Sequence, residues 1–264
     1  MRIAQIVLPG ASEYERKSQR ADRAALLEKH ELVEDVKDAQ LAHVYATGTL
    51  PGAPFVKFPV PYVASADMRR ARWSLRKPRA PEFVVSPVGE KAVPEVVEEG
   101  YWSLAPARSP RMRGEGGVVG SFHRDSTRNM VEQTLARIQR FRTDVTWKVF
   151  DRVPTPEDLA GVDVWVDPAV SDDDFDGFVA EAFVVDLPVV AARTPINSLR
   201  LEQGRTGMLV PPRDPNEMTH AILAALFKRE VADSKRQAAK QTVSKFRARQ
   251  RLRILAHLYE SLIS

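Results

Sequence analysis

The stretch that decides the fold is residues 161–226, GVDVWVDPAVSDDDFDGFVAEAFVVDLPVVAARTPINSLRLEQGRTGMLVPPRDPNEMTHAILAAL. It contains two apolar runs rich in β-branched residues, at 162–166 and 187–192. Runs of this length and composition predict buried strands. Pro168 sets the end of the first run, because proline has no N–H to donate to a strand ladder.

A turn and a helix start follow the second run. Gly204 and Gly207 predict a tight turn before a third apolar run at 208–210. Asp214 is a helix-capping residue, and Pro215 suits the first helical position because its missing N–H would have no helical partner there. Strands alternating with helices predict an α/β domain with a parallel sheet, with functional residues at the ends of the strands.

An acidic loop and a short helix lie between the first two runs. The loop carries four aspartates, Asp172, Asp173, Asp174 and Asp176. Gly177 opens a helix predicted over residues 178–185, with Glu181 in its first turn and free backbone amides at its start. Asp186 stands where this helix must turn into the next strand, and aspartate tolerates the left-handed conformation that such a turn often needs.

Taken together, these residues resemble a known family. Glu181-Ala182, the LPVVAA run, the EQGRTGMLVPP turn and the DPNEM helix start are similar in order and spacing to the carboxy-terminal domain of retaining family-four glycosyltransferases of the GT-B type. That family carries two acids separated by seven residues, normally both Glu. Here the first place holds Asp173, and Phe175 falls at the family's aromatic position.

The resemblance implies roles for the acids. Glu181 would hydrogen-bond the ribose hydroxyls of a sugar nucleotide, and Asp173 would face hydroxyls of the transferred sugar. The residues around Glu181 would complete the nucleotide site, namely Gly177, Phe178, Ala180 and Ala182. Two departures from the family involve glycines, whose absence prevents close approach of the backbone to a ligand. Asp174 and Asp176 flank the aromatic position, and Pro195-Ile196-Asn197 replaces the usual glycine pair.

The family also places an Arg and a Lys near the start of this domain to neutralise the donor phosphates. An alignment without gaps puts Ser121 and Ser126 there, but Arg124 and Arg128 are close enough in sequence to reach the same diphosphate. The alternative for both arginines is helix-surface charge. In the amino-terminal half, His43 matches a strand-end His that faces the cleft in the family and would orient an acceptor or sugar hydroxyl. A purely structural His is the alternative.

The implied architecture is GT-B-like: two trimmed Rossmann-like α/β domains that face a cleft. We expect an acceptor-side domain at 1–108 and a Pro-, Gly- and Arg-rich linker at 109–117. The donor-nucleotide domain is expected at 118–250. A closing helix at 251–264 would cross back toward the first domain.

Composition limits the class of protein. The chain has 264 residues, 44% of them hydrophobic, so it can bury a substantial core. It has no cysteine, which excludes disulfides, iron–sulfur clusters and thiol nucleophiles. The amino terminus lacks a signal-peptide pattern and no run is long enough to span a membrane, so we expect a cytoplasmic protein. A net charge of +4 suits anionic partners.

Residues 69–79, RRARWSLRKPR, contain six basic residues and one Trp. They are interpreted either as a solvated surface or as a basic surface that contacts anionic lipid or an anionic acceptor. A nucleic-acid partner is not expected, because the run lacks interleaved aromatic residues for base stacking. Peripheral contact with a membrane is therefore one expectation for this segment.

Three functions remain from the sequence. The first is transfer of a sugar from a UDP- or GDP-sugar to an unidentified acceptor, for which anionic and lipid-linked molecules are the candidates, with retention of configuration and without a required metal or other cofactor. The second is a catalytically degenerate relative that binds a nucleotide or a partner. The third is a divalent-metal site in the aspartate loop, whose spacing matches no known calcium loop. The sequence does not determine the oligomeric state.

Overall fold

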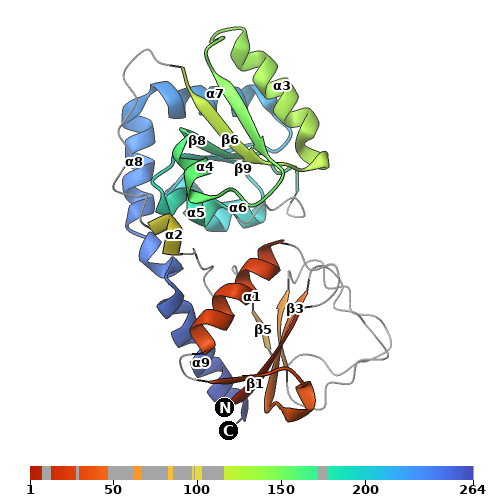
Figure 1. Ribbon diagram of the computed structural model, residues 1–264. Helices are drawn as coiled ribbons and strands as arrows, with labels where there is room; N and C mark the ends of the chain where they lie inside the picture. Colours follow the sequence, from red (N-terminus) through yellow and green to blue (C-terminus); the bar gives the residue numbers. More distant parts are fainter. Residues whose placement is uncertain are drawn as a thin grey trace. The chain divides into compact units, whose positions relative to one another are not determined.

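The structure is a computed structural model that describes residues 1–7, 13–27, 30–46, 62–66, 83–85, 97, 99–102, 116–171 and 178–263. The chain forms two compact units (Figure 1). The first unit combines Met1–Val96 with Lys245–Ser264, and the second is Val97–Ser244.

The first unit is built on a parallel sheet with the strand order β2-β1-β3-β4-β5. Its strands are β1 (Arg2–Val7), β2 (Glu31–Val33), β3 (Leu41–Ala46), β4 (Tyr62–Ala66) and β5 (Phe83–Val85). Its helices are α1 (Glu13–Leu26), the 3-10 turn η1 (Val36–Asp38) and α9 (Ala248–Ile263), which the 3-10 turn η6 (Val243–Phe246) precedes. The chain therefore begins with a strand, a helix and a second, parallel strand.

The two ends of the chain share the core of the first unit. Helix α9 packs against α1, and its Leu252, Leu255 and Tyr259 lie on one face because they are spaced three and four residues apart. They pack with buried side chains of β1 and β3, including Ile3 and Leu41. The apolar face of α9 thus completes the core of the first unit.

The second unit has a parallel sheet with the strand order β10-β9-β8-β6-β7. Its strands are β6 (Val118–Phe122), β7 (Thr146–Phe150), β8 (Val164–Asp167), β9 (Val189–Ala192) and β10 (Met208–Val210). Its helices are α2 (Glu99–Trp102), α3 (Arg128–Gln139), α4 (Pro156–Ala160), α5 (Val179–Val184), α6 (Pro195–Arg200), α7 (Pro215–Phe227) and α8 (Arg229–Lys240), with 3-10 turns η3 (Asp125–Thr127) and η5 (Glu202–Gly204).

Helices cover both faces of this sheet. Helices α3 and α7 pack together on one face, and α5 and α6 lie on the other (Figure 1). Strands β8 and β9 are buried along their whole length, which is expected of central strands covered on both sides. The core under α3 and α7 consists of Val119, Met130, Ile138, Val145, Val164, Val166, Val190, Ala192, Val210, Met218, Ile222 and Ala225.

Several local predictions are confirmed. Asp214 caps α7, because its Oδ1 accepts hydrogen bonds from the backbone N–H groups of Asn216 and Glu217 at 3.0 Å each. Asp186 has φ of 63° and Gly204 has φ of 89°, so both occupy the left-handed region that their turns require. Strand β8 lies slightly later in the chain than the apolar run at 162–166. It begins at Val164 and ends at Asp167, directly before Pro168.

The division between the units depends on contacts that composition does not reveal. Residues 99–102 group with the second unit, because the hydroxyl of Tyr101 donates a hydrogen bond to the carbonyl oxygen of Pro154 and α2 packs against α5. The composition of 109–117 placed the boundary later, and residues 109–115 of that linker lie outside the described residues. At the other end, residues from Lys245 onward group with the first unit.

Within the described residues, no helix combines the length and the apolar character needed to cross a membrane. Residues 69–79, for which peripheral membrane contact was predicted, lie outside the described part of the chain.

Candidate functional site

The strand order of the second unit places its candidate site at the end of β6. The chain passes from β6 to β7 at one edge of the sheet and then returns to β8 on the other side of β6. The connections that leave the carboxyl ends of β6 and β8 therefore diverge, and ligands of open parallel sheets bind at such a point. The first connection carries Arg124 and Arg128, and the second carries Asp173 and Glu181.

Arg124 follows β6 directly. Its backbone is extended and precedes η3, and its carbonyl oxygen accepts hydrogen bonds from the backbone N–H and the hydroxyl of Thr127, at 3.1 Å each. The Arg124 guanidinium carbon lies 5.1 Å from the centre of the Phe122 ring, which holds the cation over an aromatic face. Arg124 is half-buried, so its charge is held close to the carboxyl end of β6.

Arg128 is placed differently. It begins α3, is exposed, and its Nη2 lies 2.9 Å from Oδ1 of Asp125. An exposed pair of this kind is weak and readily exchanged. Of the two arginines that the sequence singled out, Arg124 is held against the core and Arg128 is held only by a neighbouring surface carboxylate.

Phe178 joins the two connections. It stands at the start of α5, and its ring lies 5.1 Å from that of Phe122 and 6.4 Å from that of Trp165, measured between centres. The Phe122 ring thus lies against both the Arg124 guanidinium and the Phe178 ring. The aromatic contact brings the cation after β6 and the first turn of α5 to the same end of the sheet.

Glu181 lies in α5 and is 1% exposed. The other five residues of this helix are apolar, and its neighbours Ala180 and Ala182 pack in the interior. A buried carboxylate contributes nothing to apolar packing and costs free energy of desolvation, so its presence here points to a specific polar role. A backbone hydrogen bond closes the carboxyl end of this short helix, because the N–H of Leu187 donates to the carbonyl oxygen of Ala182 at 2.8 Å.

Asp173 and Gly177 lie outside the described residues, as do Asp172, Asp174 and Asp176. The proposed contact between Asp173 and a sugar hydroxyl therefore stays a prediction. In the described part of the chain, no group of three His, Cys, Asp or Glu residues is arranged to hold a metal ion.

His43 is not at a strand end. It is the third residue of β3, which continues to Ala46, and its side chain is fully buried in the first unit. Its Nδ1 is hydrogen-bonded to the hydroxyl of Tyr259 in α9 and to that of Tyr45 at 3.1 Å. This position favours a structural role for His43, because its ring is occupied by two tyrosines from the core.

A buried network extends from His43. The Tyr45 hydroxyl donates to Oδ2 of Asp22 at 2.9 Å, and Asp22 forms a two-bonded ion pair with Arg251 of α9. Burial, and to a lesser extent the Arg251 charge, lowers the pKa of His43 to about 4, although Asp22 opposes this. Burial and Asp22 raise the pKa values of Tyr45 and Tyr259. All three side chains are therefore neutral near pH 7.

Sequence reasoning missed Asp167, the last residue of β8. It is buried at the carboxyl end of the sheet, and its Oδ1 accepts a hydrogen bond from the backbone N–H of Ala169 at 3.1 Å. That bond shapes the start of the connection that carries Asp173. An acid directly before Pro168 at the end of an apolar run was the signal in the sequence.

A comparison with protein families finds a match within the second unit. Residues 118–227 match the family model described as Glycosyl transferases group 1. This match covers most of the second unit. The predicted resemblance to GT-B glycosyltransferases is thereby confirmed, and Phe122, Arg124, Arg128, Phe178 and Glu181 lie within the matched residues. A search of curated protein sequences finds no match to the chain.

Solved structures extend the likeness from the group 1 domain to the whole chain. A glycosyltransferase from Rickettsia africae has a TM-score of 0.65 at 10% identity, over 99% of this chain and 98% of that one. HepE from Anabaena, solved in complex with UDP and glucose, has a TM-score of 0.63 at 16% identity, over 99% and 100%. The lipopolysaccharide outer core galactosyltransferase WaaB has a TM-score of 0.58 at 10% identity, over 99% of each chain. The predicted fold class, two parallel-sheet α/β units of the GT-B type, is confirmed.

Proposed function

We propose that the protein transfers a sugar from a nucleotide-sugar donor to an acceptor hydroxyl, and that its second unit holds the donor. The observation that carries the proposal is the contact of Phe122 with both Arg124 and Phe178. This contact places a fixed cation and the helix of a buried carboxylate, Glu181, at the divergence of β6 and β8 in a group 1 domain.

The two charges suit opposite parts of the donor. The guanidinium of Arg124 binds the diphosphate and stabilises the negative charge that builds up as the nucleoside diphosphate leaves, with Arg128 reaching the same oxygens from the start of α3. Glu181 accepts hydrogen bonds from the ribose hydroxyls. Asp173 contacts hydroxyls of the sugar. HepE has this fold and was solved with UDP and glucose, which supports a UDP-sugar as donor.

The proposed reaction retains the anomeric configuration. The acceptor oxygen bonds to the anomeric carbon while the bond from that carbon to the diphosphate oxygen breaks, and the departing phosphate oxygen takes the acceptor proton. Such a step requires no metal ion to balance it, since arginine charge stabilises the leaving group. The acceptor, for which an anionic or lipid-linked molecule is proposed, supplies the hydroxyl.

One observation favours the second candidate, a relative that binds a nucleotide without transferring sugar. The start of α6, where the family has its glycine pair, is filled by the chain's own side chains. Thr194 Oγ1 accepts from the backbone N–H of Asn197 at 3.2 Å, and the Asn197 side-chain amide donates to the carbonyl oxygen of Ala192 at 3.1 Å. Pro195 removes a further N–H from this turn.

Isothermal titration with UDP, GDP and their glucose and mannose conjugates tests the donor site. We expect one nucleotide to bind, and Glu181→Gln to weaken it about tenfold or more, which corresponds to about 1.4 kcal/mol. Glu132→Gln, which neutralises an exposed acid of α3, is the matched control and should leave affinity unchanged.

Release of UDP or GDP from the preferred conjugate then separates the two candidates. Turnover with a hydroxyl acceptor supports the transferase, and tight binding without turnover on any tested acceptor supports the degenerate relative. A cooperatively folded protein that binds no nucleotide contradicts both.

A further inference from the structure

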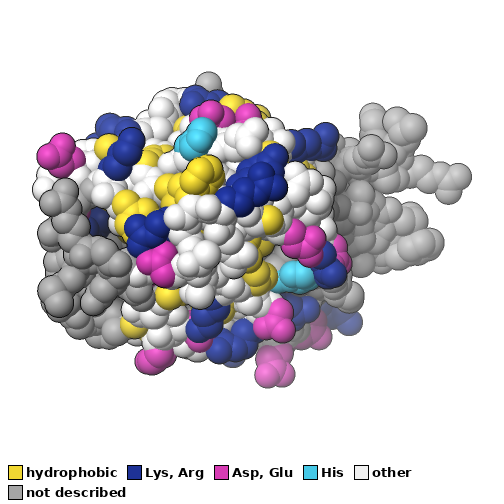
Figure 2. Space-filling view, turned by 90° about the horizontal axis from the view of Figure 1, so that it is seen from above, with side chains coloured by type: hydrophobic (Ala, Val, Ile, Leu, Met, Phe, Trp, Pro, Cys, Tyr) yellow, Lys and Arg dark blue, Asp and Glu magenta, His cyan; other side chains and the backbone are white. Residues whose placement is uncertain are grey.

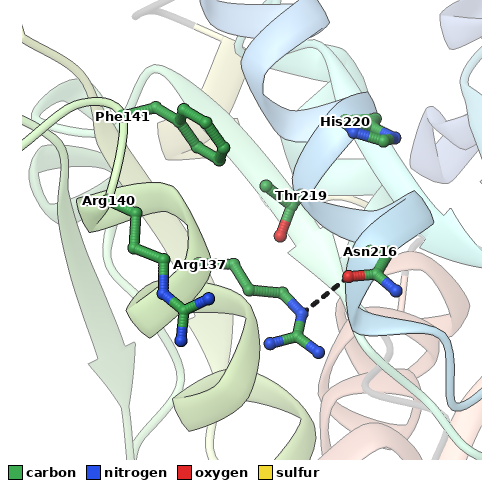
Figure 3. A pocket seen from close by; sticks show the side chains of 6 residues that line it. All are labelled: Arg137, Arg140, Phe141, Asn216, Thr219 and His220. Atoms are coloured by element: carbon green, nitrogen blue, oxygen red, sulfur yellow. Dashed lines mark hydrogen bonds between the residues drawn. The ribbon is translucent and has the colours of Figure 1, made fainter.

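A second candidate site lies on the outer side of the second unit, in a hollow between α3 and α7. Its volume is about 250 Å³, and it is lined by Arg137, Arg140, Phe141, Asn216, Thr219 and His220. Figure 3 shows that Arg137 and Arg140 extend side by side from α3, with Phe141 and His220 nearer the opposite end of the hollow. Seen from above the view of Figure 1, basic and hydrophobic side chains lie next to one another near the middle of the visible face (Figure 2).

The polar groups of this hollow are mainly donors. Arg137 Nε donates to Oδ1 of Asn216 at 2.8 Å, which fixes the Arg137 guanidinium across the hollow and uses the acceptor atom of the Asn216 amide. The Nη groups of Arg137, the whole guanidinium of Arg140 and Nδ2 of Asn216 remain as donors. Thr219 Oγ1 already donates to the carbonyl oxygen of Pro215 at 2.7 Å.

The positive charge of the two arginines is not balanced nearby. Within the described part of the chain, no carboxylate forms an ion pair with Arg137 or Arg140, whereas Arg128 and Arg142 on the same helix and its exit are paired with Asp125 and Asp144. The lining residue His220 has an acid beside it, since the carboxylate of Glu217 lies 3.8 Å from its Nδ1. Two neighbouring guanidinium groups without a carboxylate partner among the described residues are suited to a phosphate group, which both can contact through paired N–H donors.

Phe141 adds an apolar side to the hollow. Its side chain is 73% exposed, although it directly follows Arg140. The core of the unit does not include this ring, because Phe141 is neither among the buried residues under α3 and α7 nor among those packed against them. An exposed aromatic ring beside a donor-rich hollow suits a ligand that carries apolar atoms next to its phosphate.

The hollow is separate from the proposed donor site. Arg128 begins α3 and Arg137 lies nine residues later, so about 14 Å of helix axis separates them at 1.5 Å per residue. One diphosphate cannot contact both arginines closely. The groups in the hollow are therefore not explained by nucleotide-sugar binding.

We propose that the hollow between α3 and α7 binds a phosphate group that belongs either to an anionic phospholipid headgroup or to a soluble phosphorylated molecule, with Arg137 and Arg140 as its ligands and Phe141 against its apolar part. This site is independent of the donor site and of sugar transfer.

Two arms test the proposal with the full chain. In the first, inorganic phosphate is titrated against the protein while the side-chain N–H resonances of Arg137, Arg140 and Asn216 are followed by NMR, with chloride at matched ionic strength as the reference. In the second, the protein is sedimented with vesicles of phosphatidylglycerol or of phosphatidylcholine. We expect a saturable shift of these resonances in the first arm, or selective binding to the phosphatidylglycerol vesicles in the second.

The double variant Arg137→Gln/Arg140→Gln should weaken that binding roughly tenfold. Arg249→Gln/Arg253→Gln is the matched control, because it removes the same charge from exposed positions of α9 in the other unit. Melting curves and UDP affinity of both double variants should equal those of the wild type. Saturable phosphate binding with no vesicle preference assigns a soluble ligand, and vesicle binding that depends on Arg137 and Arg140 assigns a lipid headgroup. Absence of both signals, or equal loss in the two double variants, overturns the proposal.

Discussion

The two units share one sheet topology, but their interiors are filled differently. In the first unit, Asp22, His43, Tyr45, Tyr259 and Arg251 form a buried hydrogen-bonded network between β3, α1 and α9. In the second unit, the core under α3 and α7 is apolar. A polar network stabilises only if every member keeps its partner, whereas an apolar core depends on volume and burial.

The location of buried charge differs accordingly. Among the described residues of the second unit, the buried carboxylates are Asp167 at the end of β8, Glu181 in α5 and Asp186 after α5. Asp186 is held by Arg236 and Lys240 of α8, whose hydrogen bonds lower its pKa although burial alone would raise it. The comparison teaches that buried charge in the first unit joins the two ends of the chain, while in the second unit Asp167 and Glu181 lie beside the proposed donor site and Asp186 pairs with α8 beyond the other end of α5.

The largest effect is expected from Asp22→Ala. This change leaves Arg251 buried without its carboxylate and removes an acceptor from Tyr45, which should lower the free energy of unfolding of the first unit by about 3–5 kcal/mol. Urea unfolding followed by hydrogen exchange of each unit measures it, with protection lost first in α1 and α9. Asp144→Ala breaks the exposed pair with Arg142 in the second unit and should have little effect. Equal effects of the two changes would remove the distinction between the units.

A smaller effect is expected from acid. His43 has a pKa of about 4 in the folded state and about 6.5 when unfolded, so between these values the unfolded chain binds the extra proton. Its contribution to stability is complete above about pH 6.5 and decreases as pH falls toward 4. Between pH 7 and pH 5 the first unit should lose about 2 kcal/mol.

Melting curves across this pH range measure the loss, and His43→Gln should make the first unit less sensitive to pH. The charged and titratable groups that face the ring are Asp22, Tyr45, Tyr259 and Arg251. The same pH dependence in wild type and variant would assign the acid sensitivity to other groups.

The smallest effect is expected from Asp214→Ala in the second unit. It removes the side-chain oxygen that accepts from two backbone N–H groups of α7, and loss of such a cap costs about 1 kcal/mol. Urea unfolding of the second unit measures it. Asp214→Asn keeps an acceptor at the same place and should retain most of the stability. If Asp214→Ala lost as much stability as Asp22→Ala, a surface cap would matter as much as the buried network, and the distinction between the units would fail.

The sequence by itself determined the features that depend on a few neighbouring residues. The order of strands and helices in the second unit, the Asp214 cap, and the left-handed turns at Asp186 and Gly204 follow from local rules of backbone conformation and hydrogen bonding. The resemblance to the glycosyltransferase family also rested on local motifs, such as the EQGRTGMLVPP turn and the DPNEM helix start. Short-range physics acts within a few residues, so these features can be read directly from the chain.

Only the tertiary structure decided which distant side chains meet. His43 matched a strand-end pattern, but packing of α9 against the first sheet buried it between two tyrosines. The contact of Phe122 with Phe178 and the hollow between α3 and α7 join segments far apart in sequence. The physical reason is that burial and electrostatics depend on everything packed around a side chain, and sequence spacing specifies only its nearest neighbours.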